Sequence, residues 1–209
     1  MNGPLLTLFI STFVTFFVVI DPVGCAPIFA SLTSGTPAAH RRAMAIRSVT
    51  VATLILLFFA LLGEAFLRAM GIGIPAFRVA GGIMLFLIAL EMVFEKRTQR
   101  REHRAAEVKT RAPEDISIFP MAIPMIAGPG SIATAMLLTS RRAGLTEVAV
   151  VLAAMLANLL LLMLGLLAAG PLMRVLGDQI EAMVTRILGV ILAALAAQFV
   201  IDGLKASFG

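Results

Sequence analysis

The stretch VVIDPVGCAPIF (Val18–Phe29) interrupts a long apolar run with an acid, two prolines and a glycine inside seven positions. A similar interruption, MAIPMIAGPGSIATAM (Met121–Met136), occurs in the second half of the chain. Proline removes a backbone donor and clashes with the preceding helical turn, while glycine adopts conformations that other residues resist. We therefore predict that each stretch ends one helix and starts another.

The composition is that of a polytopic membrane protein. Of the 209 residues, 60% are hydrophobic and 14% are charged, and the mean hydropathy is +1.01. Soluble domains carry about 25% charged residues. Within a lipid bilayer every backbone polar group must be satisfied internally, so we expect an all-α membrane protein whose main surroundings are lipid.

Six segments are apolar and long enough to span a bilayer, which takes roughly 20 residues. The first is longer than a straight helix requires, which fits a break inside it. The predicted spans are Leu5–Thr33, Ile46–Leu67, Pro75–Phe94, Ile116–Thr139, Val148–Ala169 and Val184–Leu204.

The basic residues predict the orientation, because cytoplasmic loops carry an excess of Lys and Arg. Of the 17 Lys and Arg residues, twelve fall on one side of the predicted spans and five on the other. We expect both termini outside and the loop of residues 95–115 in the cytoplasm. The net charge of +5 lies in these loops, so nucleic acid is not an expected partner.

The two halves of the chain repeat one pattern. A shift of 106 places Gly24 on Gly130 and Cys25 on Ser131, and a shift of 108 places RVAGGI (Arg78–Ile83) over RILGVI (Arg186–Ile191). Three spans per half would make the second half enter the membrane inverted. We predict two inverted three-helix repeats, residues 1–94 and 116–209, joined by a basic linker, residues 95–115. Paired interruptions in such repeats indicate a transporter substrate site.

The two helix starts differ in charge. Pro22 and Pro129 suit the first position of a new helix, with Asp21 and Gly128 as the respective N-caps. The free N–H groups of a helix start attract anions. The second start carries no acid, so we expect it to bind a substrate carboxylate, while Asp21 faces an ammonium group or takes up a coupling proton. A small zwitterion fits between them; the alternative is that Asp21 only caps its helix.

The predicted substrate-binding residues cluster at the two breaks: Asp21, Pro22, Gly24, Cys25, Gly128, Pro129, Gly130, Ser131 and Thr134. Asn158 and Gln198 lie mid-span and are candidates for the pathway, although hydrogen bonding between helices is an equal alternative. Gly81, Gly82 and Gly189 are expected to allow close helix packing. Both histidines fall in loops, so we expect no metal site, and no cofactor is expected.

At these residues the chain resembles the MarC family of six-span membrane proteins. The resemblance rests on DPVGCAPIFASLT and PMAIPMIAGPGSIAT, supported by RVAGGIMLFLIALEM and RILGVILAALAAQFVIDGL. Cys25 replaces an asparagine associated with the first motif. The resemblance implies a bacterial or archaeal inner-membrane protein, with some relatives described as transporters of small neutral amino acids such as glycine and alanine.

The main functional hypothesis is a secondary transporter of such amino acids that works by alternating access and is coupled to a proton gradient. No GxxxxGK[ST] motif is present, which argues against ATP as the energy source, and a sodium ion is the other candidate for coupling. The alternatives are an exporter or channel for other small solutes and a scaffold without transport activity. The chain lacks HExxH and GxSxG, so we do not expect an enzyme. The sequence does not give the oligomeric state, and a homo-oligomer is one possibility.

Overall fold

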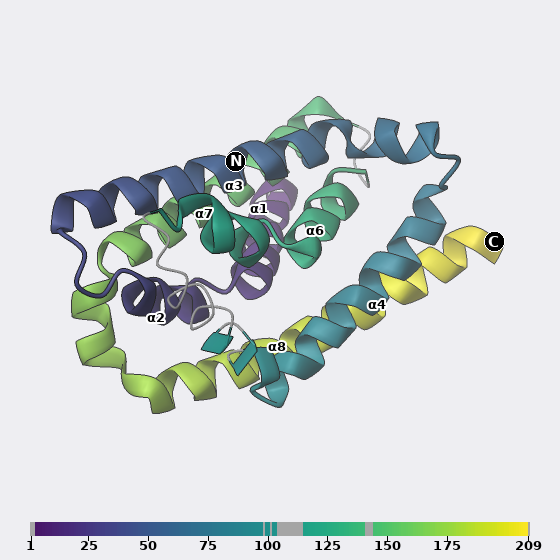
Figure 1. The fold of residues 1–209 in the computed structure, drawn as a ribbon. Coiled ribbons are helices and arrows are strands. Elements are labelled where there is room, and N and C mark those ends of the chain that lie inside the picture. The colour runs from purple at the N-terminus through teal and green to yellow at the C-terminus, as the bar shows by residue number, and fades with distance from the viewer. Residues whose placement is uncertain (1–2, 98, 101, 104–114, 141–143, 209) are drawn as a thin grey trace.

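The computed structural model describes residues 3–97, 99–100, 102–103, 115–140 and 144–208, so most of the linker at 95–115 lies outside the described residues. Figure 1 shows a bundle in which the long helix α3 runs across the other helices and α4 lies beside α8. The elements are α1 (Gly3–Ile20), α2 (Pro22–Leu32), α3 (Ala38–Ala69), α4 (Ile74–Val93), η1 (Ser117–Ile126), α6 (Pro129–Ser140), α7 (Leu145–Leu167) and α8 (Ala169–Phe208).

The structure confirms an all-α protein with broken membrane spans. Five helical segments are long and apolar enough to cross a bilayer, among them the 30 residues of Gly3–Leu32, and the pair η1 and α6, bent by 54°, provides a sixth. Two helices extend beyond the predicted spans: α3 begins at Ala38 and α8 at Ala169. Both extensions contain charged residues, so a prediction from apolar content started the two spans later than the helices begin.

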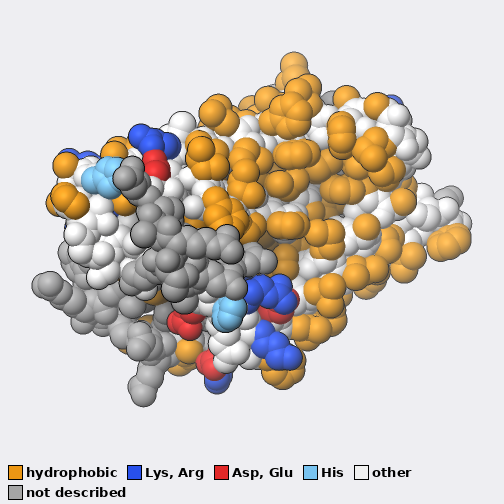
Figure 2. Space-filling view, viewed as in Figure 1, with side chains coloured by type: hydrophobic (Ala, Val, Ile, Leu, Met, Phe, Trp, Pro, Cys, Tyr) orange, Lys and Arg blue, Asp and Glu red, His pale blue; other side chains and the backbone are white. Residues whose placement is uncertain are grey.

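Large apolar side chains cover the outside of the bundle. Leu54, Leu87 and Val190 are each more than half exposed. In Figure 2 hydrophobic side chains cover much of the right-hand part of the visible face, while charged side chains lie at its upper left and lower centre. This surface suits contact with acyl chains, since soluble proteins rarely expose apolar patches of such extent. The chain is an integral multi-pass membrane protein.

Helices α4 and α8 pack closely through glycines, as the sequence predicts for Gly82 and Gly189. A Cβ atom built at Gly82 would lie 2.9 Å from the carbonyl oxygen of Ala196, and one at Gly189 would lie 3.1 Å from that of Ala89. A shift of 107 residues exchanges these two contacts. Small residues allow the backbones of membrane helices to approach, which gives close van der Waals packing.

The wider packing has the same symmetry. Helices α2 and α6 begin at Pro22 and Pro129, and α3 and α7 begin at Ala38 and Leu145, so both pairs of starts are 107 residues apart. Helix α1 packs against α7 as η1 packs against α3, and α2 packs against α8 as α6 packs against α4. Exchanging the two halves maps these contacts onto one another, and this arrangement fits an inverted repeat.

Ion pairs lie where several helices end. Arg47 near the start of α3 pairs with Asp115 before η1, and Arg186 in α8 pairs with Glu95 after α4. At the other end of α3, Arg68 pairs with Glu64 at 2.7 Å. The charges thus lie near both ends of α3 and leave its apolar middle for the membrane. Arg141 and Arg142 lie outside the described residues.

Candidate substrate site at the paired helix breaks

The first break lies at Asp21, between α1 and α2. Asp21 has a left-handed backbone (φ 58°, ψ 69°) and its Oδ1 accepts a hydrogen bond of 3.0 Å from the N–H of Gly24. The side chain therefore caps α2, as the sequence predicts. Left-handed geometry ends the α1 ladder, and Asp tolerates it better than most residues because its short polar side chain can bond locally. Asp21 is only 1% exposed.

The break leaves the last carbonyl groups of α1 to other donors. Pro22 has no N–H to offer to the Val18 carbonyl. The Ile20 carbonyl accepts from the Cys25 thiol at 3.5 Å. The Val19 carbonyl accepts from Arg97 Nη2 at 2.7 Å, a contact between residues 78 positions apart. A side chain that follows α4 thus donates a hydrogen bond to the carbonyl end of α1.

Arg97 is the residue at this site that sequence reasoning missed. It belongs to a run of basic residues after α4 that reads as a solvated cytoplasmic connector. Its other terminal nitrogen, Nη1, lies 3.0 Å from the sulfur of Met92, a fully buried residue in the last turn of α4. No local pattern distinguishes Arg97 from its basic neighbours, because its partner is distant in the sequence.

The second break is approached through the irregular helix η1. Its backbone bonds span five residues, from Met121 N to Ile116 O (3.3 Å) and from Ala127 N to Ala122 O (2.9 Å). Pro120 and Pro124 lie within it, and the residue before each has an extended backbone. Residues before proline are pushed out of the helical region. The approach to this break is therefore itself irregular.

Helix α6 starts directly after Gly128. The N–H of Ile132 donates to the Gly128 carbonyl at 3.0 Å, the first bond of the new helix. A Cβ atom at Gly128 would lie 2.4 Å from the Pro124 carbonyl oxygen, so only glycine fits here. Gly128 is buried, whereas Pro129 is exposed.

The two breaks meet in the structure. A Cβ atom at Gly130, in the first turn of α6, would lie 3.6 Å from Cγ1 of Val19, in the last turn of α1. Leu85 and Ile88 of α4 pack on the same glycine. The carbonyl end of one helix therefore lies beside the amide start of another. Of the predicted binding residues, those buried here are Asp21, Pro22, Gly24, Cys25, Gly128, Gly130, Ser131 and Thr134.

Polar side chains at the other predicted positions have different surroundings. The Thr134 hydroxyl is buried and makes no hydrogen bond within the described part of the chain. Asn158 is fully buried and its Nδ2 donates to the Phe13 carbonyl at 3.2 Å, which joins α7 to α1. Gln198 is exposed, and its Nε2 donates to Asp202 Oδ1 at 2.7 Å along α8. Asn158 thus lies in the interior, and Gln198 lies on the outer side of its helix.

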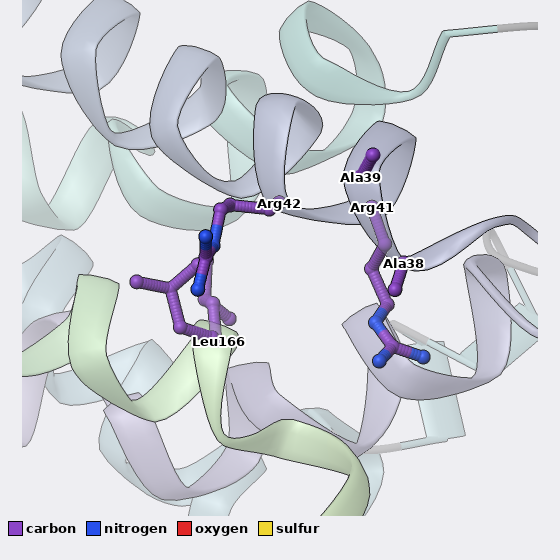
Figure 3. Close-up of a pocket in the computed structure, with 6 residues that line it drawn as sticks. Ala38, Ala39, Arg41, Arg42 and Leu166 are labelled. Carbon is purple, nitrogen blue, oxygen red and sulfur yellow. The ribbon is translucent and has the colours of Figure 1, made fainter.

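A cavity of about 380 Å³ lies elsewhere, between the first turn of α3 and the end of α7. Figure 3 shows Arg42 and Leu166 on one side of it and Arg41 with Ala38 and Ala39 on the other. None of the predicted binding residues is among its described lining residues. The breaks themselves are closely packed in this conformation, so a substrate would enter only after neighbouring helices move apart.

Comparison with known proteins gives matches over nearly the whole chain. A family model described as "MarC family integral membrane protein" matches residues 6–208. A UPF0056 membrane protein of Methanocaldococcus jannaschii is 36% identical over 94% of this chain and 96% of its own length. YvbG of Bacillus subtilis is 34% identical over 95% of both chains, and YhcE of Escherichia coli is 32% identical over 94% of this chain and 91% of its own. These names specify no substrate. No solved structure matches the chain.

Proposed function

The chain belongs to the MarC family of integral membrane proteins, and from that premise we propose that it is a secondary transporter of small neutral amino acids. Glycine and alanine are the proposed substrates, the inner membrane is the proposed location, and a proton gradient is the proposed energy source. The proposal rests on the geometry of the breaks. The carbonyl end of α1 and the amide start of α6 lie against each other inside the bundle.

Opposite helix ends suit the two charges of an amino acid. The start of a helix carries about half a positive charge and its end about half a negative charge. A substrate carboxylate would bind the N–H groups near Gly130 and Ser131, and its ammonium group would face the end of α1 and Asp21. Only a small side chain suits this position, since Val19, Leu85 and Ile88 already surround Gly130.

Asp21 is the proposed group for the coupling proton. An ionised acid within a span costs about 2.5–3.5 kcal/mol on insertion scales, so its presence calls for a compensating role. One carboxylate oxygen caps α2 through Gly24. The cap requires an acceptor oxygen, which asparagine also supplies, whereas proton uptake requires the carboxylate. The two roles are therefore separable by experiment.

Alternating access would act on the packing seen here. In transporters with inverted repeats, one repeat rocks or gates against the other around a fixed site. The pairs α3–α7 and α4–α8 join the two halves, and the proposed site is where α1 and α6 meet. Separation of these pairs on one side at a time would expose the breaks first to one compartment and then to the other.

Uptake by the purified full-length protein tests the proposal. Proteoliposomes are loaded with neutral buffer, and radiolabelled glycine and alanine are added outside at neutral or acidic pH. We expect saturable accumulation that increases several-fold when a proton gradient is imposed, with leucine and glutamate as competitors that fail. A flux that never exceeds equilibration and ignores the gradient would instead support a channel. Absence of any flux would exclude amino-acid transport.

A further inference from the structure

The end of α1 already holds a positively charged group in this structure. Arg97 Nη2 donates to the Val19 carbonyl at 2.7 Å, and Nη1 lies against the Met92 sulfur at 3.0 Å. Arginine stays protonated under all ordinary conditions. A guanidinium group from the linker thus lies on the carbonyl end of a helix that ends inside the bundle.

Several features make this helix end attractive to cations. The last carbonyls of a helix share about half a negative charge. The Val18 carbonyl receives no N–H from Pro22, and the Ile20 carbonyl accepts from the thiol of Cys25, which is a weak donor. The carboxylate of Asp21 follows directly in the chain and is buried. Three carbonyl groups and one carboxylate thus belong to four consecutive residues at the break.

We propose that the carbonyl end of α1 is a cation site, and that Arg97 occupies it in this conformation in competition with the transported or coupling cation. This inference deepens the proposed function and rests on it. Backbone carbonyls at the C-terminal ends of broken helices coordinate coupling ions such as Na⁺ in transporters. The ligand is Na⁺ or a primary ammonium group, both of which need the Val19 carbonyl oxygen that Arg97 now contacts.

Competition by Arg97 has a measurable consequence. When only a fraction of the molecules can bind, the apparent dissociation constant rises by the inverse of that fraction. If the guanidinium leaves the site about one tenth of the time, its removal tightens cation binding about ten-fold. The change Arg97→Gln removes the charge and keeps one N–H donor for Val19. Arg100→Gln is the matched control, because Arg100 pairs with Glu91 at 2.6 Å and is more than half exposed.

Thermal unfolding of the purified full-length protein in detergent provides the binding measurement. The midpoint is followed against NaCl, against ethylammonium chloride, and against choline chloride at equal ionic strength. We expect the half-saturating concentration of NaCl or of ethylammonium to fall about ten-fold in Arg97→Gln and to stay unchanged in Arg100→Gln. A fall for Na⁺ alone assigns the site to Na⁺ as the coupling ion in place of the proposed proton, and a fall for ethylammonium assigns it to the substrate amine. Unchanged or weaker binding of both cations overturns the inference.

A second variant keeps the test decisive if Arg97→Gln does not fold. Arg97→Lys keeps the charge but cannot contact Val19 and Met92 together, so it should compete less well and tighten binding by a smaller factor. Binding no tighter than in the wild type would then overturn the inference. The readout is independent of flux. Cation binding that tightens in a protein without glycine or alanine transport would leave the site standing and refute the proposed substrate.

Discussion

Asp21 combines a left-handed backbone, a helix cap and a buried carboxylate in one residue. Asn retains the acceptor for the Gly24 N–H and tolerates the left-handed region, so Asp21→Asn should fold normally. Its free energy of unfolding should lie within about 0.5 kcal/mol of the wild-type value. Because it cannot take up a proton, its gradient-driven uptake in proteoliposomes should fall to background. Asp21→Ala should lose about 1 kcal/mol through the missing cap. Normal uptake by Asp21→Asn would reduce Asp21 to a cap.

Gly128 has space for hydrogen and nothing larger. In Gly128→Ala the new Cβ would lie 2.4 Å from a backbone oxygen, which cannot move without displacing η1. We expect a loss of about 3 kcal/mol or more of unfolding free energy. Gly165→Ala in α7 is the control, because no heavy atom lies within 4 Å of its Cβ position and alanine favours a helix by about 0.5–1 kcal/mol. Equal thermal shifts for both variants would refute the close approach at Gly128.

Single residues also mark the limit of prediction from sequence. The interruptions at Asp21 and Gly128 were visible because proline and glycine act on their own backbone. Arg97 was not, because its contact with Val19 depends on how the end of α4 folds back onto α1. The place of Gln198 on the outer side of α8 was equally hidden, since a mid-span position does not tell which side of the helix faces the bundle.

Among the elements, the α4–α8 pair makes the repeat testable. Ala at Gly82 or at Gly189 would press on a backbone carbonyl of the opposite helix at 2.9 or 3.1 Å. Each change should therefore cost a similar amount, about 1–3 kcal/mol. At Gly81 the nearest atom is a Leu137 methyl group at 3.0 Å, which can rotate away, so Gly81→Ala should cost less. Reversible unfolding in mixed micelles measures the three values. A large difference between Gly82→Ala and Gly189→Ala would argue against matched interfaces.

The start of η1 is held by Asp115, whose carboxylate accepts from both the hydroxyl and the N–H of Ser117 and pairs with Arg47. The Ser117 hydroxyl bond is the largest cause that holds the pKa of Asp115 below its ordinary value of 3.8, with the Ser117 N–H and Arg47 adding to it against the effect of burial. A lowered folded-state pKa means that this stability is complete well above pH 3.8. It is lost as the pH falls below 3.8 and through the lowered pKa.

The variant Asp115→Asn should therefore be less stable than the wild type at pH 7 by about 0.5–1 kcal/mol, a small value because the side chain is 34% exposed. At pH 3 the gap between the two proteins should narrow. Thermal unfolding at the two pH values measures it. A gap that stays constant, or widens in acid, would contradict the assigned pKa direction.

The elements show what periodic pattern can and cannot provide. Long apolar runs predicted six spans because lipid permits little else. The bend of 54° between η1 and α6 depends on bonds that span five residues around two prolines, and apolar content carries no such information. The polar start of α3 was also missed by apolar content. The helix continues without a break from Ala38, directly after Pro37, into the apolar run.

For the whole molecule, the distribution of charge predicts one orientation in the membrane. Seven Lys and Arg residues lie between Lys96 and Arg111. The pairs Arg47–Asp115 and Arg186–Glu95 join the beginning of α3 to that of η1, and α8 to the end of α4. A bilayer with an acidic inner surface would hold this basic end on the cytoplasmic side, by about 1 kcal/mol per basic residue near the surface. Both termini would then lie outside.

Cysteine labelling tests this orientation in intact cells. Cys25 is fully buried and its thiol donates to Ile20, so Cys25→Ser removes the native thiol while it keeps a donor. Ser34→Cys, between α2 and α3, and Ser207→Cys, near the end of α8, are both exposed positions. A membrane-impermeant maleimide should label Ser207→Cys in whole spheroplasts and Ser34→Cys only after lysis. Six spans, an even number, place both termini on the same side of the membrane. The reverse labelling would therefore mean that every loop lies on the side opposite to the predicted one. Arg97 would then approach the break from outside, and the cation site at the end of α1 would open first to that compartment.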